Sequence, residues 1–158
     1  MIRRRHAARA ILVTPNREIL LLRIQAPGDS EFFWITPGGG LEEGETVESG
    51  LRRELREELG LVDFHVGPLV WRRQHTFDWG DQRICQSEQY FVVHVPRFKP
   101  RIFDDEEMRV VDTIQWWPVA DLGTIPDRLT PLSLAAIVEN YLSFGPPKTP
   151  PEIEVLID

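Results

Sequence analysis

Three glutamates close together in the chain have a spacing suited to holding a divalent cation. Glu54, Glu57 and Glu58 fall within one predicted helix, where each residue is rotated by about 100° from the last. Their side chains therefore share an arc of about 100° on the helix surface. Hard cations such as Mg²⁺ take oxygen ligands, commonly a few carboxylates together with oxygens of a phosphorylated substrate. The spacing thus indicates a metal site that would act on phosphorylated compounds.

An ordinary solvated helix face is the alternative interpretation of the same glutamates. Helices with interspersed arginines often carry ion pairs between residues four apart and bind nothing. Here, however, three close carboxylates repel one another unless a positive group joins them. Only Arg53 lies at the border of this arc, where it can hold a carboxylate with two hydrogen bonds. We therefore favour the cation site.

The helix that must carry these glutamates has clear start and stop signals. Thr46 is suited to cap its first turn, and Gly60 stands where a left-handed terminal residue is expected. Leu51, Leu55 and Leu59 form an apolar stripe next to the carboxylates. The pattern predicts a helix docked on a sheet, with its glutamates at the edge of the contact.

The stretch from Gly39 to Leu61 resembles the Nudix box, G-x5-E-x7-R-E-U-x-E-E-x-G-U, in which U is aliphatic. A short motif is a hypothesis, but matches at nine spaced positions are not expected by chance. The preceding W-x-x-P-G-G segment, residues 34–39, resembles the lead-in common in that family. The defined positions are filled in order by Gly39, Glu45, Arg53, Glu54, Leu55, Glu57, Glu58, Gly60 and Leu61.

This resemblance implies a fold and an activity. Nudix domains are α/β/α sandwiches with a mixed central sheet, and Nudix enzymes hydrolyse diphosphate linkages with the help of Mg²⁺, or of Mn²⁺ as an alternative. Carried over by position, Glu54, Glu57 and Glu58 would bind the metal with the backbone carbonyl of Gly39. Glu45 and Arg53 would orient these carboxylates.

The general base varies within the family, so several carboxylates are open. The first choice is Glu54 or Glu57, which would accept a proton from the attacking water. Members of the family also use a carboxylate outside the box. In this chain the candidates of that kind are Glu88, Glu106, Glu107 and Asp112.

Three residues outside the box are candidates for substrate binding. Arg23, at the end of a predicted strand, could meet a phosphate or project into solvent. Phe77 and Trp79 lie at a predicted hairpin tip, where an exposed aromatic ring could stack on a nucleobase or pack on its own hairpin.

Absent signatures narrow the substrate class. The lead-in is PGGG rather than the lysine-containing variant of dinucleoside polyphosphate hydrolases, and Thr76 stands near the place of the proline found in many ADP-ribose pyrophosphatases. A nucleoside di- or triphosphate hydrolase is favoured, with ADP-ribose or a sugar nucleotide as the alternative substrate. A Nudix module that senses a nucleotide without hydrolysing it is a further alternative, although no box carboxylate is missing.

Composition predicts one compact domain that does not bind a nucleic-acid polymer. The chain has 158 residues, 42% of them hydrophobic, and a net charge of −7. Phosphodiester backbones are usually met by basic surfaces. A single cysteine, Cys85, excludes an internal disulfide and suits the cytoplasm. The apolar run after the arginines at 3–5 is too short for a signal peptide or a membrane span.

We expect the domain to occupy residues 1–145, followed by a Pro-rich tail over 146–158. The tail could dangle or pack on a second subunit, which leaves a homodimer open. Predicted strands span 8–13 and 18–24, which form a hairpin, and 66–77, 84–95 and 113–118. A last helix is predicted to start at Thr130 as its cap and to run to about residue 142.

Overall fold

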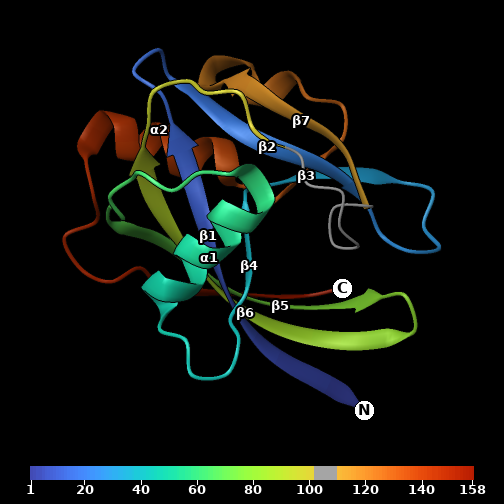
Figure 1. Ribbon diagram of the computed structural model, residues 1–158. Coiled ribbons are helices and arrows are strands. Elements are labelled where there is room, and N and C mark those ends of the chain that lie inside the picture. Colours follow the sequence, from blue (N-terminus) through green and yellow to red (C-terminus); the bar gives the residue numbers. More distant parts are fainter. Residues whose placement is uncertain (102–109) are drawn as a thin grey trace.

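A mixed nine-stranded sheet forms the centre of the computed structural model, which describes residues 1–101 and 110–158 (Figure 1). Among the elements of the described residues, two α-helices and the 3-10 helix η2 accompany it. In chain order the elements are β1 (Ile2–Val13), β2 (Glu18–Gln25), β3 (Phe32–Ile35), β4 (Gly38–Gly40), α1 (Val47–Leu59), β5 (Leu69–Trp79), β6 (Gln82–His94), β7 (Val111–Pro118), η2 (Val119–Thr124), β8 (Arg128–Thr130), α2 (Leu134–Phe144) and β9 (Ile153–Ile157).

The strand order is β8-β3-β2-β1-β6-β5-β9, with β4 paired to β1 and β7 paired to β2. Three of the pairings are parallel, those of β1 with β6, β3 with β8 and β5 with β9, and the others are antiparallel. The mixed sheet expected from the Nudix resemblance is confirmed, as is the β1–β2 hairpin.

The sheet is buried on both faces. Alternate residues of β1 point to opposite sides, so that Ile11 and Val13 join one core while Ala10 and Leu12 join the other. Helix α1 covers the second core, and α2 with η2 covers the first. Figure 1 shows α1 in front of the central strands and α2 behind them, which is the predicted α/β/α sandwich.

Helix α1 begins and ends where the sequence predicts. The Thr46 hydroxyl accepts a hydrogen bond from the Ser49 backbone N–H at 3.0 Å, and Gly60 closes the helix with φ of 71°. The leucine stripe at 51, 55 and 59 is fully buried against the sheet. The glutamates are therefore fixed in rotation about the helix axis by the apolar contact beside them.

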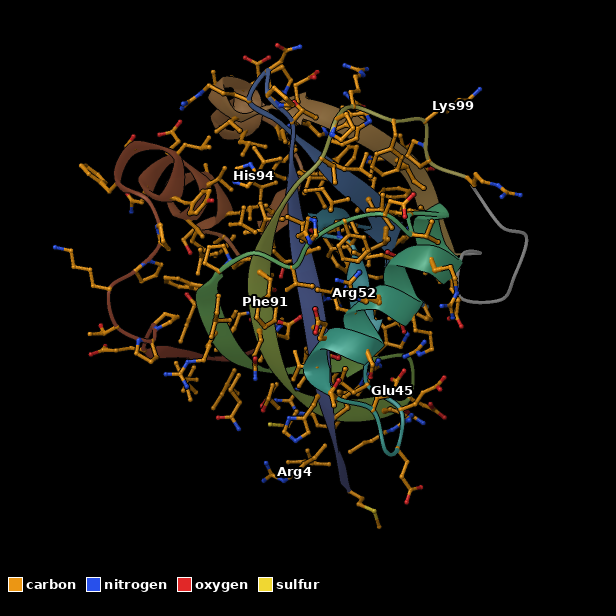
Figure 2. The ribbon with its side chains drawn as sticks, turned by 60° about the vertical axis from the view of Figure 1, so that its left-hand side comes forward. Arg4, Glu45, Arg52, Phe91, His94 and Lys99 are labelled. Atoms are coloured by element: carbon orange, nitrogen blue, oxygen red, sulfur yellow. The ribbon has the colours of Figure 1, made fainter. Side chains whose placement is uncertain are left out.

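Strand β1 is longer than predicted because its first half gains a partner that is distant in sequence. It pairs in parallel with β6 over its whole length, from Ile2 opposite Arg83 to Val13 opposite His94. Hydrogen bonds to β6 hold even the arginine-rich end in an extended conformation. Figure 2 shows Arg4 at this end of β1, away from both helices.

The predicted start of the last helix is wrong. Helix α2 begins at Leu134 with Ser133 as its N-cap, and Thr130 belongs instead to strand β8. The reason is a tertiary contact: Thr130 pairs with Ile35 of β3, and its hydroxyl accepts a hydrogen bond from Arg73 at 2.8 Å. That hydroxyl is not capping a helix.

The C-terminal tail takes neither of the two expected courses. Residues 153–157 form β9, which adds in parallel to the outer edge of β5 within the same chain. Asp158 then reaches His75, with Oδ2 2.6 Å from the ring Nε2. The homodimer stays a prediction. Among the described residues, no helix is long and apolar enough to cross a membrane.

Candidate active site

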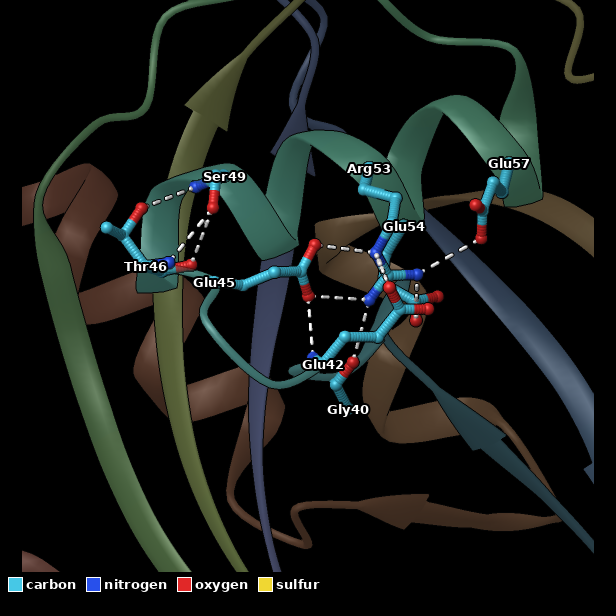
Figure 3. Close-up of polar contacts among 8 residues, drawn as sticks. All are labelled: Gly40, Glu42, Glu45, Thr46, Ser49, Arg53, Glu54 and Glu57. Atoms are coloured by element: carbon cyan, nitrogen blue, oxygen red, sulfur yellow. Dashed lines mark hydrogen bonds and ion pairs between the residues drawn. The ribbon is translucent and has the colours of Figure 1, made fainter.

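Arg53 is the centre of a group of carboxylates on α1 and the loop before it (Figure 3). Its Nε and Nη2 atoms bind both carboxylate oxygens of Glu45, at 2.7 and 3.0 Å. Its Nη1 atom donates to Glu54 and to Glu57, each at 3.1 Å. We call Glu45, Arg53, Glu54 and Glu57 the box cluster. Arg53 thus contacts the helix carboxylates as predicted, but through one hydrogen bond each, and its bidentate partner is Glu45 of the preceding loop rather than one of them.

Charge in the box cluster is unbalanced. The hydrogen bonds that Arg53 donates to Glu45 keep the pKa of its guanidinium above the usual range, so the group stays charged. Arg53, and after it the backbone N–H of Glu42, lowers the pKa of Glu45. Within the box cluster one guanidinium thus faces three carboxylates, and a further cation would balance this surplus of carboxylates.

Strand β4 lies against the box cluster. Arg53 Nη2 donates to the Gly40 carbonyl at 2.9 Å, and the Gly38 N–H donates to Glu58 Oε1 at 3.2 Å. A Cβ atom on Gly39 would lie 2.6 Å from the carboxylate carbon of Glu54. A side chain at position 39 would therefore have to displace the Glu54 carboxylate, which lies beside the peptide at 39.

The donor atoms gathered here fit a hard divalent cation. They are carboxylate oxygens of Glu54, Glu57 and Glu58 and backbone carbonyls of β4, which are the ligands that Mg²⁺ and Mn²⁺ prefer. Arg53 and Gly38 hold these carboxylates in the structure, and no three acidic, histidine or cysteine side chains of the described residues already converge on one point. Cation binding would require Glu57 and Glu54 to turn from Arg53.

Beside these groups lies a cleft of about 780 Å³, a volume suited to a nucleotide. Glu54, Glu58 and strand β4 line one wall. Of the predicted substrate residues, Phe77 and Trp79 of β5 line it as well. The metal candidates Gly39, Glu54 and Glu58 and the aromatic candidates therefore line one cavity, whereas Glu57 is not among its lining residues.

Arg23 is engaged elsewhere. Its Nε donates to Asp127 and its Nη1 to Asp112, both at 2.9 Å, and the guanidinium stacks 3.8 Å above the ring centre of Phe32. Hydrogen bonds from Arg23 and Thr113 hold the pKa of Asp112 below its usual range. The role of Arg23 as a phosphate ligand stays a prediction, and it requires the ion pairs with Asp112 and Asp127 to open.

A second group of charges lies buried at the cleft, and sequence reasoning did not assemble it. Glu88 accepts from Arg73 Nε at 2.7 Å on one oxygen and from Arg9 Nε at 3.2 Å on the other. Gln86 and Tyr90 donate to the same carboxylate at 3.0 and 3.2 Å. We call Arg9, Arg73, Gln86, Glu88 and Tyr90 the inner cluster.

Glu88 was a candidate base, and its surroundings make it a poor one. Burial alone would raise its pKa, but Arg9 and Arg73 outweigh burial and leave the pKa below the usual range. A carboxylate with a lowered pKa and saturated hydrogen bonds accepts a proton weakly. Asp112 is likewise paired with Arg23, and Glu106 and Glu107 lie outside the described residues. These observations favour the box carboxylates.

The inner cluster depends on strand register. Arg73 lies opposite Glu88 in the β5–β6 pair, while Arg9 lies opposite Tyr90, two residues further on, in the β1–β6 pair. The three chain segments are far apart in sequence. The available signal was the alternation of Gln86, Glu88 and Tyr90 along β6, which puts these three side chains on one face of the sheet.

Comparison with known proteins agrees with this geometry. The family model described as the NUDIX domain matches residues 3–137. An RNA pyrophosphohydrolase from Sphingopyxis alaskensis is 27% identical over 141 residues, covering 83% of this chain and 87% of that protein. A nucleoside triphosphatase NudI from Klebsiella pneumoniae is 49% identical over 54 residues, covering 31% of this chain and 38% of that protein. The chain thus matches well under half of the NudI protein's length.

A solved structure shows the same fold. The NUDIX domain of Shewanella oneidensis NrtR, crystallised with ADP ribose, superposes with a TM-score of 0.66 at 19% identity and covers 88% of each chain. At this identity the likeness concerns the fold.

Proposed function

The chain belongs to the Nudix hydrolase family, and we propose that it hydrolyses a diphosphate linkage in a nucleoside di- or triphosphate or a related nucleotide, with Mg²⁺. The box cluster is the observation that carries this proposal. It gathers three carboxylates around one arginine, and its Glu54 lines, together with Glu58, the wall of a cleft of nucleotide size.

Glu54, Glu57 and Glu58, with the Gly39 carbonyl, would hold the cation; Mn²⁺ would serve as well. When bound, such a cation neutralises charge that develops on the phosphate oxygens and lowers the pKa of water. Glu54 or Glu57 accepts the proton of the water that attacks phosphorus, while the bond from that phosphorus to the bridging oxygen breaks. Before the cation binds, Arg53 holds Glu54 and Glu57 at the site through its hydrogen bonds.

Phe77 and Trp79 are proposed to stack on the nucleobase. Both are half-buried at the cleft, where an aromatic face adds contact area without a large entropy cost. Arg23 is proposed to meet a phosphate after releasing Asp112 and Asp127, and the substrate's own negative charge would favour that exchange.

The substrate class is supported by the relatives' names and by charge. NudI is named a nucleoside triphosphatase and the Sphingopyxis protein an RNA pyrophosphohydrolase. Both names describe the hydrolysis of phosphate groups on a nucleotide compound. The net charge of −7 favours a free nucleotide over a polymer. ADP-ribose or a sugar nucleotide is the alternative, supported by the ADP-ribose complex of the NrtR domain. We further propose a cytoplasmic location, which the single Cys85 suits.

Glu57→Gln tests the proposal because it removes one charge and keeps the volume. We expect turnover to fall by about 10²- to 10⁴-fold, the range for removing a group that acts in the transition state. Glu57 is 45% exposed, so the melting temperature should hardly change. Glu43→Gln, an exposed carboxylate of the preceding loop, is the matched control.

The measurement is phosphate or pyrophosphate release from nucleoside triphosphates, diphosphates, ADP-ribose, sugar nucleotides and dinucleoside polyphosphates, with and without EDTA. One class that turns over only with Mg²⁺ would identify the substrate. Full activity of Glu57→Gln would overturn the metal assignment. Nucleotide binding without hydrolysis of any compound would replace the enzyme by a nucleotide sensor.

A further inference from the structure

Arg9 joins the inner cluster to the glycine segment beside the metal carboxylates. We infer that Arg9, held in turn by Glu88, is a positioning residue that sets strand β4 at the distance metal binding needs. The inference rests on the proposed function, since it concerns the same metal site.

The contacts of Arg9 define this role. Its Nε donates to Glu88 Oε2 at 3.2 Å, while its Nη1 donates to the carbonyls of Thr36 and Gly38, at 3.3 and 3.1 Å. Burial would lower the pKa of Arg9, but Glu88 outweighs it and keeps the guanidinium charged. One planar group therefore fixes β6 and the start of β4 at the same time.

The contact continues to the metal candidates. The peptide of Gly38 accepts from Arg9 at its carbonyl and donates at its N–H to Glu58, at 3.2 Å. The next residue, Gly39, carries the carbonyl proposed as a metal ligand and lies against the Glu54 carboxylate. A shift of Gly38 would thus move the N–H that binds Glu58, the backbone that lies against Glu54, and the Gly39 carbonyl together. Groups that orient metal ligands typically contribute 10- to 100-fold to metal affinity.

Stability alone does not account for this arrangement. A buried ion pair can often be replaced by apolar residues of similar volume without loss of stability. The side chains of Arg9 and Glu88 are 14% and 2% exposed, so their desolvation is costly. Arg73 offers a natural comparison, because it binds the same Glu88 but joins it to Thr130 of β8 rather than to β4.

Arg9→Met and Arg73→Met form a matched pair for the test. Each removes one guanidinium from Glu88, but only the first also removes the side-chain hydrogen bonds to the carbonyls of Thr36 and Gly38. Isothermal titration calorimetry with Mn²⁺ alone, without substrate, measures the metal affinity of folded protein. We expect Arg9→Met to raise the Kd by about 10- to 100-fold and Arg73→Met to change it by less than about 3-fold, within the scatter expected of a residue that orients no ligand.

Equal weakening by both variants, or by neither, would overturn the inference. If circular dichroism shows that Arg9→Met does not fold, the conservative pair Arg9→Lys and Arg73→Lys gives the answer, because an ammonium group cannot reproduce the fork that reaches the carboxylate and two carbonyls. We expect Arg9→Lys to weaken Mn²⁺ binding more than Arg73→Lys does, and equal Mn²⁺ affinity of the two variants would overturn the positioning role of Arg9. Two controls separate the positioning role of Arg9 from the proposed function. Wild-type protein that binds no Mn²⁺, or Glu57→Gln that binds it as tightly as wild type, contradicts the proposed metal site itself.

Discussion

The molecule holds two clusters of arginine and glutamate at one cleft, and they have opposite composition. In the box cluster one arginine serves three glutamates, and Glu57 remains 45% exposed. In the inner cluster two arginines serve one glutamate, and the side chains of Arg73 and Glu88 are only 4% and 2% exposed. The same two residue types therefore form one group with a surplus of carboxylates that opens to solvent at Glu57, and one saturated, buried group.

The difference shows what each cluster can do. A surplus of carboxylates at a cleft attracts a cation and can change partners when one arrives. A buried carboxylate that two guanidinium groups saturate has no capacity for another ligand, and breaking it leaves an unpaired buried charge. We therefore assign chemistry to the box cluster and positioning to the inner cluster.

The largest expected effect is on stability, from breaking the inner cluster. Arg73→Met leaves Glu88 with one guanidinium in a desolvated site, and loss of one partner of a buried pair typically costs about 3–5 kcal/mol. Glu57→Gln, at the exposed end of the box cluster, should cost about 1 kcal/mol or less, as for ion pairs near solvent. Urea unfolding followed by circular dichroism measures both free energies of unfolding. Similar losses for the two variants would contradict the distinction between the clusters.

The two clusters also differ in how far the sequence predicts them. The box cluster lies within 13 residues, from Glu45 to Glu57, and helical periodicity with Thr46 and Gly60 as end signals places its side chains. Local rules sufficed because the partners lie on one helix and its leading loop. The inner cluster requires the parallel register of β1 on β6, which no local pattern determines.

The same limit explains the errors in the fold. Thr130 and the following proline form a valid helix-start signal, but pairing with Ile35 and the bond from Arg73 place Thr130 in a strand. The Pro-rich segment before β9 indicates the end of a domain, yet the residues after it find an open strand edge on β5. Both outcomes depend on contacts between segments distant in sequence.

A smaller effect is expected within the box cluster, on activity. Glu45→Gln weakens the bidentate contact that orients Arg53, and loss of such an orienting group typically costs about 10- to 100-fold in metal affinity or activity. Glu42→Gln is the matched control, because Glu42 is 68% exposed and its carboxylate lies 3.7 Å from Arg53 Nε. Hydrolysis rates at several Mg²⁺ concentrations distinguish the two. Equal losses of hydrolysis rate in the two variants would show that net charge, rather than the bidentate contact between Glu45 and Arg53, orients the site.

The smallest effect concerns a third pair, His75 and Asp158, which lines the same cleft and joins β5 to the residue after β9. Burial lowers the pKa of His75 below 6.5, and the hydrogen bond to Asp158 offsets only part of this shift. The unfolded chain therefore binds a proton more readily, so this contribution to stability is complete above pH 6.5 and is lost as the pH falls toward the lower folded pKa. Urea unfolding at pH 7.5 and 5.5 measures how much the free energy of unfolding falls between the two pH values. This fall should be smaller for His75→Gln than for wild type. It should be larger for Asp158→Asn, because the Asp158 carboxylate of the wild type favours the protonated ring. The opposite order would mean that His75 is charged in the folded protein and that the pair resembles the two arginine clusters in holding a permanent cation.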